Sequence, residues 1–435
     1  MNIDAIIKPF QRFGVHLGLQ RIYKLLENLG NPHLQVPVIH VAGTNGKGSV
    51  CAYLSSVLTE AGYRTGRYTS PHLVDWTERI TLNQEPISQQ DWSNLLLEVK
   101  GKIDPNEESP TLFELITAAA WLYFAQQKVD IAIIEVGLGG RLDATNVCPQ
   151  PLVSIITSIS REHWQQLGPT VADIAREKAG IIKAGCPVVV GQLPLDAQEV
   201  VLTQTKKLDC PTYIPQPASQ LDDGWAEYSS IFDSKPIKYP LPLAGQIQLS
   251  NSVLALAALE ILQNLGWQIT EGAIIQGMAL TKWPGRMQWT QWQYNNTTYK
   301  LLLDGAHNSG SAVVLRNYID SLNVKSVSWV VGMLSTKEHD EIFKALLRPS
   351  DRLYIVPVPD PSSAKSEDLA QLASQIGPLK SCQTYTDLKS ALDAAFALPE
   401  LNYFDFDNFT DKAAKDLVVL CGSLYLIGHF LGMRE

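Results

Sequence analysis

Short apolar runs recur along the chain and alternate with longer segments of helical periodicity. Each run is bounded by polar, glycine or proline residues, which is typical of buried strands. Strands are expected at residues 36–41, 131–136, 152–159, 187–190, 300–303, 326–331, 352–355 and 417–421. Strands that alternate with helices form parallel sheets covered by helices on both faces, so the pattern predicts the α/β class.

The length of the chain and one break in the pattern indicate two domains. The 435 residues exceed the roughly 100–200 that are usual for one domain. Between residues 283 and 300 a Pro-Gly break is followed by alternation without a sustained helical period, and this favours a junction there. We expect an N-terminal domain at residues 1–285 with a parallel sheet and a smaller Rossmann-like domain at residues 296–435. The polar residues 216–240 are interpreted as an excursion or β-hairpin of the first domain.

The first expected strand leads into a glycine-rich turn, residues 40–49 (HVAGTNGKGS), and then into a helix. Glycines let backbone N–H groups converge on an anion, the helix adds its positive N-terminal end, and Lys47 can reach the outer phosphates of a nucleotide. The common pattern G-x-x-x-x-G-K-[ST] is changed, because Val41 stands for its first glycine and Gly48 follows the lysine. A turn that binds no ligand is the alternative. The loop residues expected to hold a nucleoside triphosphate are Thr44, Asn45, Gly46, Lys47, Gly48 and Ser49, and Ser49 is left open as a metal ligand.

A second polar cluster follows the strand at residues 131–136 and reads EVGLGGRLDATN (residues 135–146). A carboxylate at the C-terminal end of a parallel strand lies where such folds bind ligands, so Glu135 is a candidate Mg²⁺ ligand. The glycines allow the backbone to approach a substrate closely, and Arg141 and Asp143 can then orient its polar groups. The alternative is that Glu135 caps a helix and that Arg141 and Asp143 form a surface pair.

A third cluster follows the strand at residues 152–159 and contains His163. Because His163 follows a strand end as Glu135 does, we expect the two to share a cleft. Further along, Lys178 stands among apolar residues, and a buried lysine loses its proton easily. From the residues alone, a solvated Lys178 paired with Asp173 or Glu177 is nevertheless the favoured interpretation.

Composition narrows the class of protein. The net charge of −9 argues against a nucleic-acid partner. A cationic N-terminus with a long apolar core is absent, as is any run of about 18 apolar residues, so a cytoplasmic protein without membrane contact is expected. The six cysteines (51, 148, 186, 210, 382 and 421) show no C-x-x-C spacing and are expected to be reduced.

Taken together, nine segments resemble the folylpolyglutamate synthase and dihydrofolate synthase family of the Mur ligase superfamily. They are residues 40–49, 69–73 (TSPHL), 78–80 (ERI), 111–114 (TLFE), 135–146, 177–183 (EKAGIIK), 283–286 (WPGR), 304–308 (DGAHN) and 422–425 (GSLY). They span nearly the whole chain in the family's order.

The resemblance implies an ATP-dependent ligase that needs Mg²⁺. ATP would phosphorylate the carboxyl of dihydropteroate, or the γ-carboxyl of a reduced folate, to an acyl phosphate, and the amine of L-glutamate would attack it. A phosphate-binding loop with a lysine and Mg²⁺ suits this chemistry, because phosphoryl transfer asks mainly for positioning and charge neutralisation.

The resemblance also implies roles for single residues. The Mg²⁺ ligands would be Ser70, Glu135, His163 and, once its amine is carboxylated, Lys178, which would hold a second ion. ATP would contact Asn251, Arg286 and Asp304 as well as Lys47, with His307 near the reacting groups. The residues matched to substrate binding are Arg21, Arg79, Phe113, Glu114, Arg141, Leu142 and Asp143.

Four positions depart from the family pattern. Glu162 stands where aspartate is usual, Ile247 replaces a histidine, Ser309 replaces a proline, and Glu338 follows Lys337 in place of aspartate. Residues 360–365 also lack the arginine often found there, which leaves the binding of glutamate unsettled.

Several alternatives stay open. The N-terminal segment 18–21 (GLQR) resembles the bacterial bifunctional form, so both ligase activities are expected, with a monofunctional enzyme as the alternative. A nucleotide-gated switch would need only the loop and Mg²⁺ site, and a cell-wall amino-acid ligase is the nearer rival. A monomer is expected.

Overall fold

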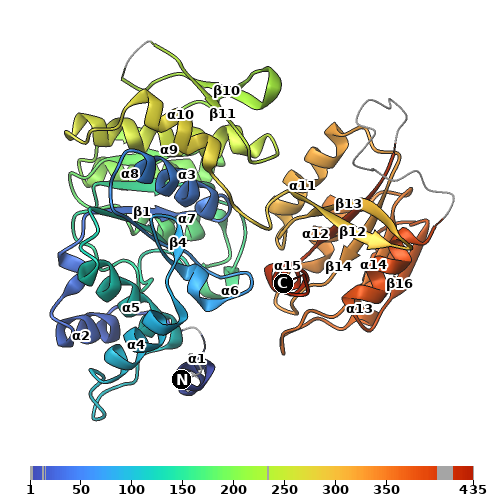
Figure 1. Cartoon of the computed structure of the whole chain (residues 1–435), viewed down its shortest axis with the longest axis horizontal. Helices are drawn as coiled ribbons and strands as arrows, with labels where there is room; N and C mark the ends of the chain where they lie inside the picture. Colours follow the sequence, from blue (N-terminus) through green and yellow to red (C-terminus); the bar gives the residue numbers. More distant parts are fainter. Residues whose placement is uncertain (1–2, 12–13, 15, 233–234, 399–414, 435) are drawn as a thin grey trace. The chain divides into compact units, whose positions relative to one another are not determined.

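The computed structural model describes residues 3–11, 14, 16–232, 235–398 and 415–434. Contacts divide the chain into two compact units (Figure 1), one formed by Met1–Pro242 with Gln248–Lys282 and the other by Leu243–Ile247 with Trp283–Glu435. The domain boundaries at residues 285 and 296 stay a prediction. Among the described residues, no helix combines the length and apolar character that crossing a bilayer requires.

The first unit is built on an eight-stranded sheet in the order β4-β3-β2-β5-β1-β6-β7-β8. The strands are β1 (Val38–Ala42), β2 (Thr65–Tyr68), β3 (Ile80–Leu82), β4 (Glu85–Pro86), β5 (Ile131–Glu135), β6 (Val153–Ile156), β7 (Val188–Val190) and β8 (Thr212–Tyr213). Along the part of the sheet ordered β2-β5-β1-β6-β7-β8, all neighbouring strands pair in parallel, as the sequence predicts. Strands β3 and β4 add an antiparallel edge beside β2. The central strands are buried on both faces.

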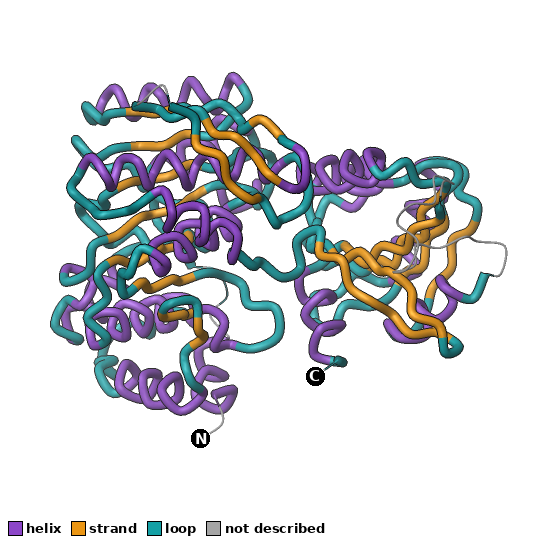
Figure 2. Tube along the Cα trace, turned by 45° about the horizontal axis from the view of Figure 1, so that its top comes forward, coloured by secondary structure: helices purple, strands orange, loops and turns teal. Residues whose placement is uncertain are grey.

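Helices flank the strands of this sheet (Figure 2), and two apolar clusters identify helices that pack on one face of it. Val38 packs with one apolar cluster that includes α1, α2, α4 and α5, and Ala42 on the same face packs with a second that includes α7 and α8. Helix α3 contacts α10, where Ser56 Oγ donates to the carbonyl of Gly277, and α9, where the Tyr53 hydroxyl donates to Gln248 Oε1 at 3.4 Å. The helices are α1 (Ile3–Gln11), α2 (Gln20–Asn28), α3 (Lys47–Glu60), α4 (Gln89–Lys100), α5 (Leu112–Gln126), α6 (Trp164–Leu167), α7 (Val171–Ala179), α8 (Leu195–Lys207), α9 (Ile247–Asn264) and α10 (Glu271–Leu280).

The polar stretch at residues 216–240 forms a small antiparallel sheet of β9 (Ser219–Gln220), β10 (Trp225–Tyr228) and β11 (Ile237–Pro240). Its buried Tyr228 hydroxyl donates to Glu260 of α9 at 2.9 Å. The hairpin interpretation is therefore confirmed.

The second unit has a six-stranded sheet in the order β12-β13-β17-β14-β15-β16. Its elements are β12 (Gln288–Tyr294), β13 (Thr297–Leu303), α11 (Ser309–Ser321), β14 (Ser326–Val331), α12 (His339–Leu346), β15 (Arg352–Ile355), α13 (Ser366–Ile376), β16 (Ser381–Thr384), α14 (Leu388–Phe396), β17 (Asp416–Cys421) and α15 (Leu424–Gly432). Among the described strands of this sheet, only β12 pairs antiparallel, with β13. The sequence predicts no strand at β12, where tryptophans alternate with polar residues.

A buried carboxylate organises the polar end of this second sheet. Asp351 is 1% exposed and accepts hydrogen bonds from Arg316 Nη1 and Trp329 Nε1, both at 2.9 Å, and from the backbone N–H groups of Arg348 and Val327. Four donors compensate the buried charge, so removing the carboxylate leaves all four donors without an acceptor.

We therefore expect Asp351→Ala to lower the free energy of unfolding by about 3–5 kcal/mol, the usual effect of breaking a buried pair. The matched control is Asp320→Ala, because Asp320 also pairs with Arg316, at 2.7 Å, but is half-exposed. That change should cost less than about 1 kcal/mol. Urea unfolding measures both, and equal losses would contradict the argument.

Candidate functional site

The glycine-rich turn connects β1 to the first turn of α3. Gly46 precedes the helix at φ 86°, without a side-chain cap, so the N–H groups of the first helical turn are left for another partner. The turn is fixed from behind, because the Thr44 N–H donates to the Ser158 carbonyl at 2.7 Å and the Asn45 N–H to the Ser158 hydroxyl at 3.1 Å. The phosphate-type loop is thus held in place by the segment that follows β6.

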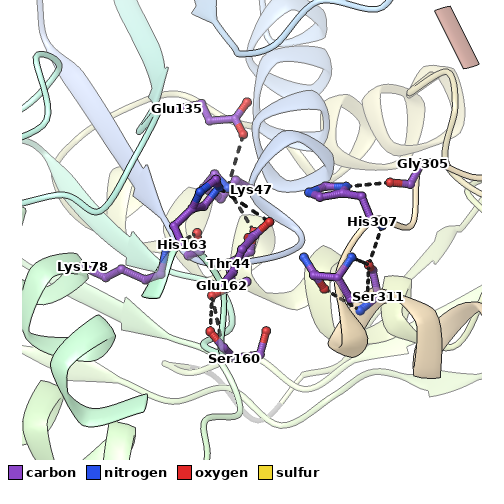
Figure 3. Close-up of polar contacts among 12 residues, drawn as sticks. Thr44, Lys47, Glu135, Ser160, Glu162, His163, Lys178, Gly305, His307 and Ser311 are labelled. Atoms are coloured by element: carbon purple, nitrogen blue, oxygen red, sulfur yellow. Dashed lines mark hydrogen bonds and ion pairs between the residues drawn. The ribbon is translucent and has the colours of Figure 1, made fainter. Parts of the chain in front are cut away.

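Lys47 and Glu135 approach each other at this loop (Figure 3), with Nζ and Oε1 3.8 Å apart. Lys47 Nζ also donates to the Thr44 carbonyl at 3.1 Å. Glu135 ends β5, beside β1, and its second oxygen accepts the Ser70 N–H at 3.3 Å. The strand ends therefore bring together a cation, a carboxylate and the Ser70 segment, as the sequence predicts.

Lys178 is buried, which overturns the interpretation as a solvated residue paired with Asp173 or Glu177. It is 5% exposed, and its Nζ donates to the carbonyl of Gly43 at 2.7 Å. Burial, with the charge of Lys47 as a smaller cause, lowers the pKa of Lys178 to about 7. Its amine is therefore partly neutral near pH 7.

His163 lies at the start of α6 with φ 50°, and its Nε2 is 3.7 Å from Glu162 Oε1. Its side chain is 45% exposed. Among the described residues, no group of three or more His, Cys, Asp or Glu side chains gathers as a metal site. Mg²⁺ usually takes one or two carboxylates and completes its shell with water and substrate phosphates, so the donor set of Glu135 and a hydroxyl fits that ion.

Two buried amides of α9 face the loop from the other side. Asn251 lies against Gly46, where a Cβ would come within 2.4 Å of Asn251 Oδ1. Gln248 accepts from Asn251 at 3.2 Å and donates to Ser49 Oγ at 3.5 Å. Ser49 is itself buried, and Gln248, which sequence reasoning did not select, is the residue that its hydroxyl meets.

The glycine run at residues 137–146 packs backbone to backbone against α7. A Cβ on Gly140 would lie 2.7 Å from the Glu177 carbonyl, and one on Gly137 would lie 2.3 Å from Phe113. Arg141 is exposed and pairs with Glu177 at 2.8 Å. Asp143 is buried and accepts the N–H of Leu138 at 2.7 Å. The alternative of a surface pair between Arg141 and Asp143 is therefore wrong.

Other residues matched to substrate binding lie near this run. Arg21 Nη2 pairs with the buried Glu114 at 3.0 Å, and the Leu142 carbonyl accepts the Gly18 N–H at 3.3 Å. The ring of Phe113 lies 6.2 Å from that of Tyr68, which the sequence did not single out although it precedes the segment 69–73.

Arg79 belongs to a separate aromatic cluster. Its Nε donates to His72 Nδ1 at 2.9 Å, and its guanidinium lies 4.6 Å from the ring centre of Trp76. Burial, and secondly the Arg79 charge, lowers the pKa of His72 to about 4. The imidazole is therefore neutral and accepts from Arg79.

In the second unit, the segments 283–286 and 304–308 meet. Asp304 is buried and accepts the N–H groups of Met287 at 2.9 Å and Ala306 at 2.8 Å. Burial raises the pKa of this carboxyl. Arg286 packs against Gly305, and His307 Nδ1 is 2.7 Å from the Gly305 carbonyl (Figure 3).

Comparison with known proteins gives matches along most of the chain. Residues 41–259 match the Mur ligase middle domain, and residues 288–433 match the dihydrofolate synthetase C-terminal domain. Dihydrofolate synthetase of Saccharomyces cerevisiae is 36% identical over 97% of this chain and 98% of its own length. Dihydrofolate synthase/folylpolyglutamate synthase of Bacillus subtilis is 33% identical over 96% and 94%.

A solved structure of a bifunctional folylpolyglutamate synthase/dihydrofolate synthase with Mn, AMPPNP and L-glutamate bound is similar throughout. It is 30% identical, covers 100% of this chain and 98% of its own, and has a TM-score of 0.82.

The contact between Gly46 and Asn251 leads to a prediction about binding of Mg-ATP, the ligand expected from the sequence. Gly46→Ala adds a methyl that collides with Asn251 Oδ1, so we expect at least a tenfold weaker affinity, about 1.4 kcal/mol. Gly62→Ala is the control, because Gly62 has a similar φ of 90° but open space around it. Both lose stability through backbone strain. Titration calorimetry with an ATP analogue gives the affinities, and equal values for the two variants would refute the prediction.

Proposed function

Because this chain belongs to the family of dihydrofolate and folylpolyglutamate synthases within the Mur ligases, we propose that it joins L-glutamate to a pterin carboxyl group with ATP. The enzyme accepts both dihydropteroate and the γ-carboxyl of a reduced folate, so it is bifunctional. The observation that carries this proposal is the convergence of Lys47, Glu135 and Lys178 on one glycine-rich loop.

The reaction has two steps. A carboxylate oxygen of the acceptor attacks the γ-phosphorus of ATP, which releases ADP and forms an acyl phosphate. The amine nitrogen of L-glutamate then attacks the acyl carbon, phosphate leaves, and the amine loses a proton. The loop N–H groups and Lys47 neutralise charge on the transferred phosphoryl group. Asn251, Arg286 and Asp304 are assigned to ATP, and His307 to the reacting groups.

The metal ligands in this proposal are Ser70, Glu135 and His163. Bound Mg²⁺ supplies further charge neutralisation on the phosphates. Lys178 takes up carbon dioxide on its neutral amine, losing a proton, and the resulting carbamate is an anion that suits a second Mg²⁺. The lowered pKa of Lys178 supports this, because only the neutral amine reacts.

The pterin is assigned to the residues that surround the run 137–146. Phe113 offers a ring beside this backbone, which suits a flat heterocycle. Arg21 and Arg79 offer cations, each already oriented by Glu114 or His72. Arg141 and Leu142 complete the set, and Asp143, which accepts the Leu138 N–H, holds the backbone of the run. We also propose that the enzyme acts as a monomer.

The proposal predicts that ADP release requires both glutamate and a pterin. Purified protein with Mg-ATP and L-glutamate is compared with dihydropteroate, tetrahydrofolate or no acceptor, and products are identified by mass. Both acceptors should gain glutamate. Glutamylation of dihydropteroate alone would narrow the function to that of the Saccharomyces cerevisiae relative, and ATP hydrolysis indifferent to every acceptor would favour a nucleotide switch.

Lys178→Ala is expected to lower kcat at least about a hundredfold, the effect of removing one charge-stabilising group. Formate or acetate should restore part of the activity by replacing the carbamate. In the wild type, the mass increment of one carbon dioxide should rise from about pH 6 to about pH 8, because the neutral amine becomes more populated as the pH passes the folded pKa.

The control is Lys183→Ala, because burial also lowers the pKa of Lys183 but the proposal gives it no role. It should keep its activity. Full activity of Lys178→Ala, or rescue of Lys183→Ala by acetate, would remove Lys178 from the metal site.

A further inference from the structure

Three buried side chains link the strand of the phosphate loop to the glycine run. His40 lies in β1, and its Nε2 is 2.9 Å from Thr145 Oγ1. The Thr145 hydroxyl donates to Asp143 Oδ1 at 2.5 Å. His40 and Thr145 are 0% exposed and Asp143 is 2% exposed. The three therefore form a chain of hydrogen bonds shielded from water.

The direction of each hydrogen bond follows from the donors around Asp143. Its Oδ1 accepts both the N–H and the hydroxyl of Thr145, and its Oδ2 accepts the Leu138 N–H at 2.7 Å. Each oxygen of Asp143 receives a backbone N–H, which can only donate, and Oδ1 accepts the Thr145 hydroxyl as well. Since the Thr145 hydroxyl donates its single proton to Asp143, it accepts the proton of His40 Nε2.

His40 is thus a neutral imidazole with one tautomer. Burial, and then the charge of Lys183, lowers the pKa of His40 to about 3, so it stays uncharged at working pH. Its Nδ1 is buried and makes no hydrogen bond with any residue that the structure describes. The imidazole is therefore a fixed donor toward Thr145.

This series of hydrogen bonds determines the shape of the glycine run. Asp143 joins the start of the run, at Leu138, to its end at Thr145, and three donors occupy acceptor positions on its two oxygens. The next residue, Asn146, donates to the carbonyls of Arg141 at 3.0 Å and Gly180 at 3.1 Å. Little capacity remains on Asp143 for a ligand, whereas the backbone that it shapes lies against Phe113.

We propose that His40 is a positioning residue for the pterin acceptor. It holds Asp143 through Thr145, and Asp143 acts on the loop backbone and not on the substrate. This inference rests on the proposed ligase function and assigns a second role to β1, which carries the phosphate loop at its end and fixes the pterin loop from its middle.

The test measures KM for the pterin acceptor and for Mg-ATP separately in Thr145→Val, which keeps the shape of Thr145 but loses both hydroxyl contacts. We expect KM for the pterin to rise about tenfold, with KM for Mg-ATP and kcat within about twofold, because the loss falls on uniform binding of one substrate. Thr145→Ser keeps the hydroxyl and should restore the wild-type KM.

The matched control is Thr205→Val, because Thr205 is also buried but its hydroxyl donates to the Leu202 carbonyl within α8, away from the glycine run. Its KM values should stay unchanged. Equal effects of the two valine variants, or an unchanged pterin KM in Thr145→Val, would overturn the proposal. A wild type without glutamate-dependent turnover would refute the ligase function instead, so the two failures are distinguishable.

A double-mutant cycle tests His40 itself. His40→Leu should raise the pterin KM as Thr145→Val does, and the double variant should show no further rise, because both changes break one chain. Multiplying effects would mean that the two residues act independently, and this would exclude the link. If His40→Leu does not fold, the comparison of Thr145→Val with Thr145→Ser still decides.

Discussion

The hydrogen bond from Lys178 to the Gly43 carbonyl is the interaction on which the first unit's site depends. It ties α7 to the residue that opens the phosphate loop, although the two lie far apart in sequence. Burial moves the pKa of Lys178 from 10.5 to about 7, so between these values the unfolded chain binds more protons than the folded one. Stability therefore rises with pH across this window. The fold retains a destabilising amine at neutral pH, which is typical of a group kept for chemistry.

Direct backbone packing transmits this constraint to the glycine run at residues 137–146. Gly140 lies against the carbonyls of Glu177 and Lys178, and Gly180 lies against Arg141, where a Cβ would come within 2.4 Å of the Arg141 Cβ. A side chain at either glycine would push α7 away from the loop and move Lys178 with it. Because His40 of β1 also contacts this run through Thr145, the phosphate loop and the run are both tied to the same buried elements. Support of this kind helps to hold reacting groups within the narrow tolerance that catalysis needs.

The sequence predicts the framework well, because buried parallel strands appear as apolar runs. β14 and β15 have the expected bounds, and β1, β5, β6, β7, β13 and β17 lie within a few residues of them. β2 was missed because it contains Gly66 and Arg67, which contradict an apolar run although both are buried. β12 was missed because its tryptophans are only partly covered. The local pattern of apolar residues therefore identifies a strand whose side chains are all apolar. It misses a strand in which a polar residue is buried.

The site was predictable where its residues follow the ends of predicted strands. The convergence of Lys47 and Glu135 follows from the rule that parallel strands end at one edge. The burial of Lys178 does not follow from the sequence, since Lys178 stands beside other charged residues in α7. Tertiary packing alone decides which of these side chains faces Gly43. The contact of His40 was not predicted for a related reason. Its partner Thr145 is distant in sequence, and a histidine in an apolar strand gives no local indication of its hydrogen bond.

The departures from the family pattern fall mostly where the fold tolerates them. Ile247 and Ser309 are the first residues of α9 and α11, and Glu338 directly precedes α12. At helix starts the geometry is set by the cap, and Asn308 caps α11 whatever residue follows it. Glu162 differs, because its charge raises the pKa of Lys178 against the effect of burial. Glu162 is therefore an anion close enough to act on the buried amine of Lys178.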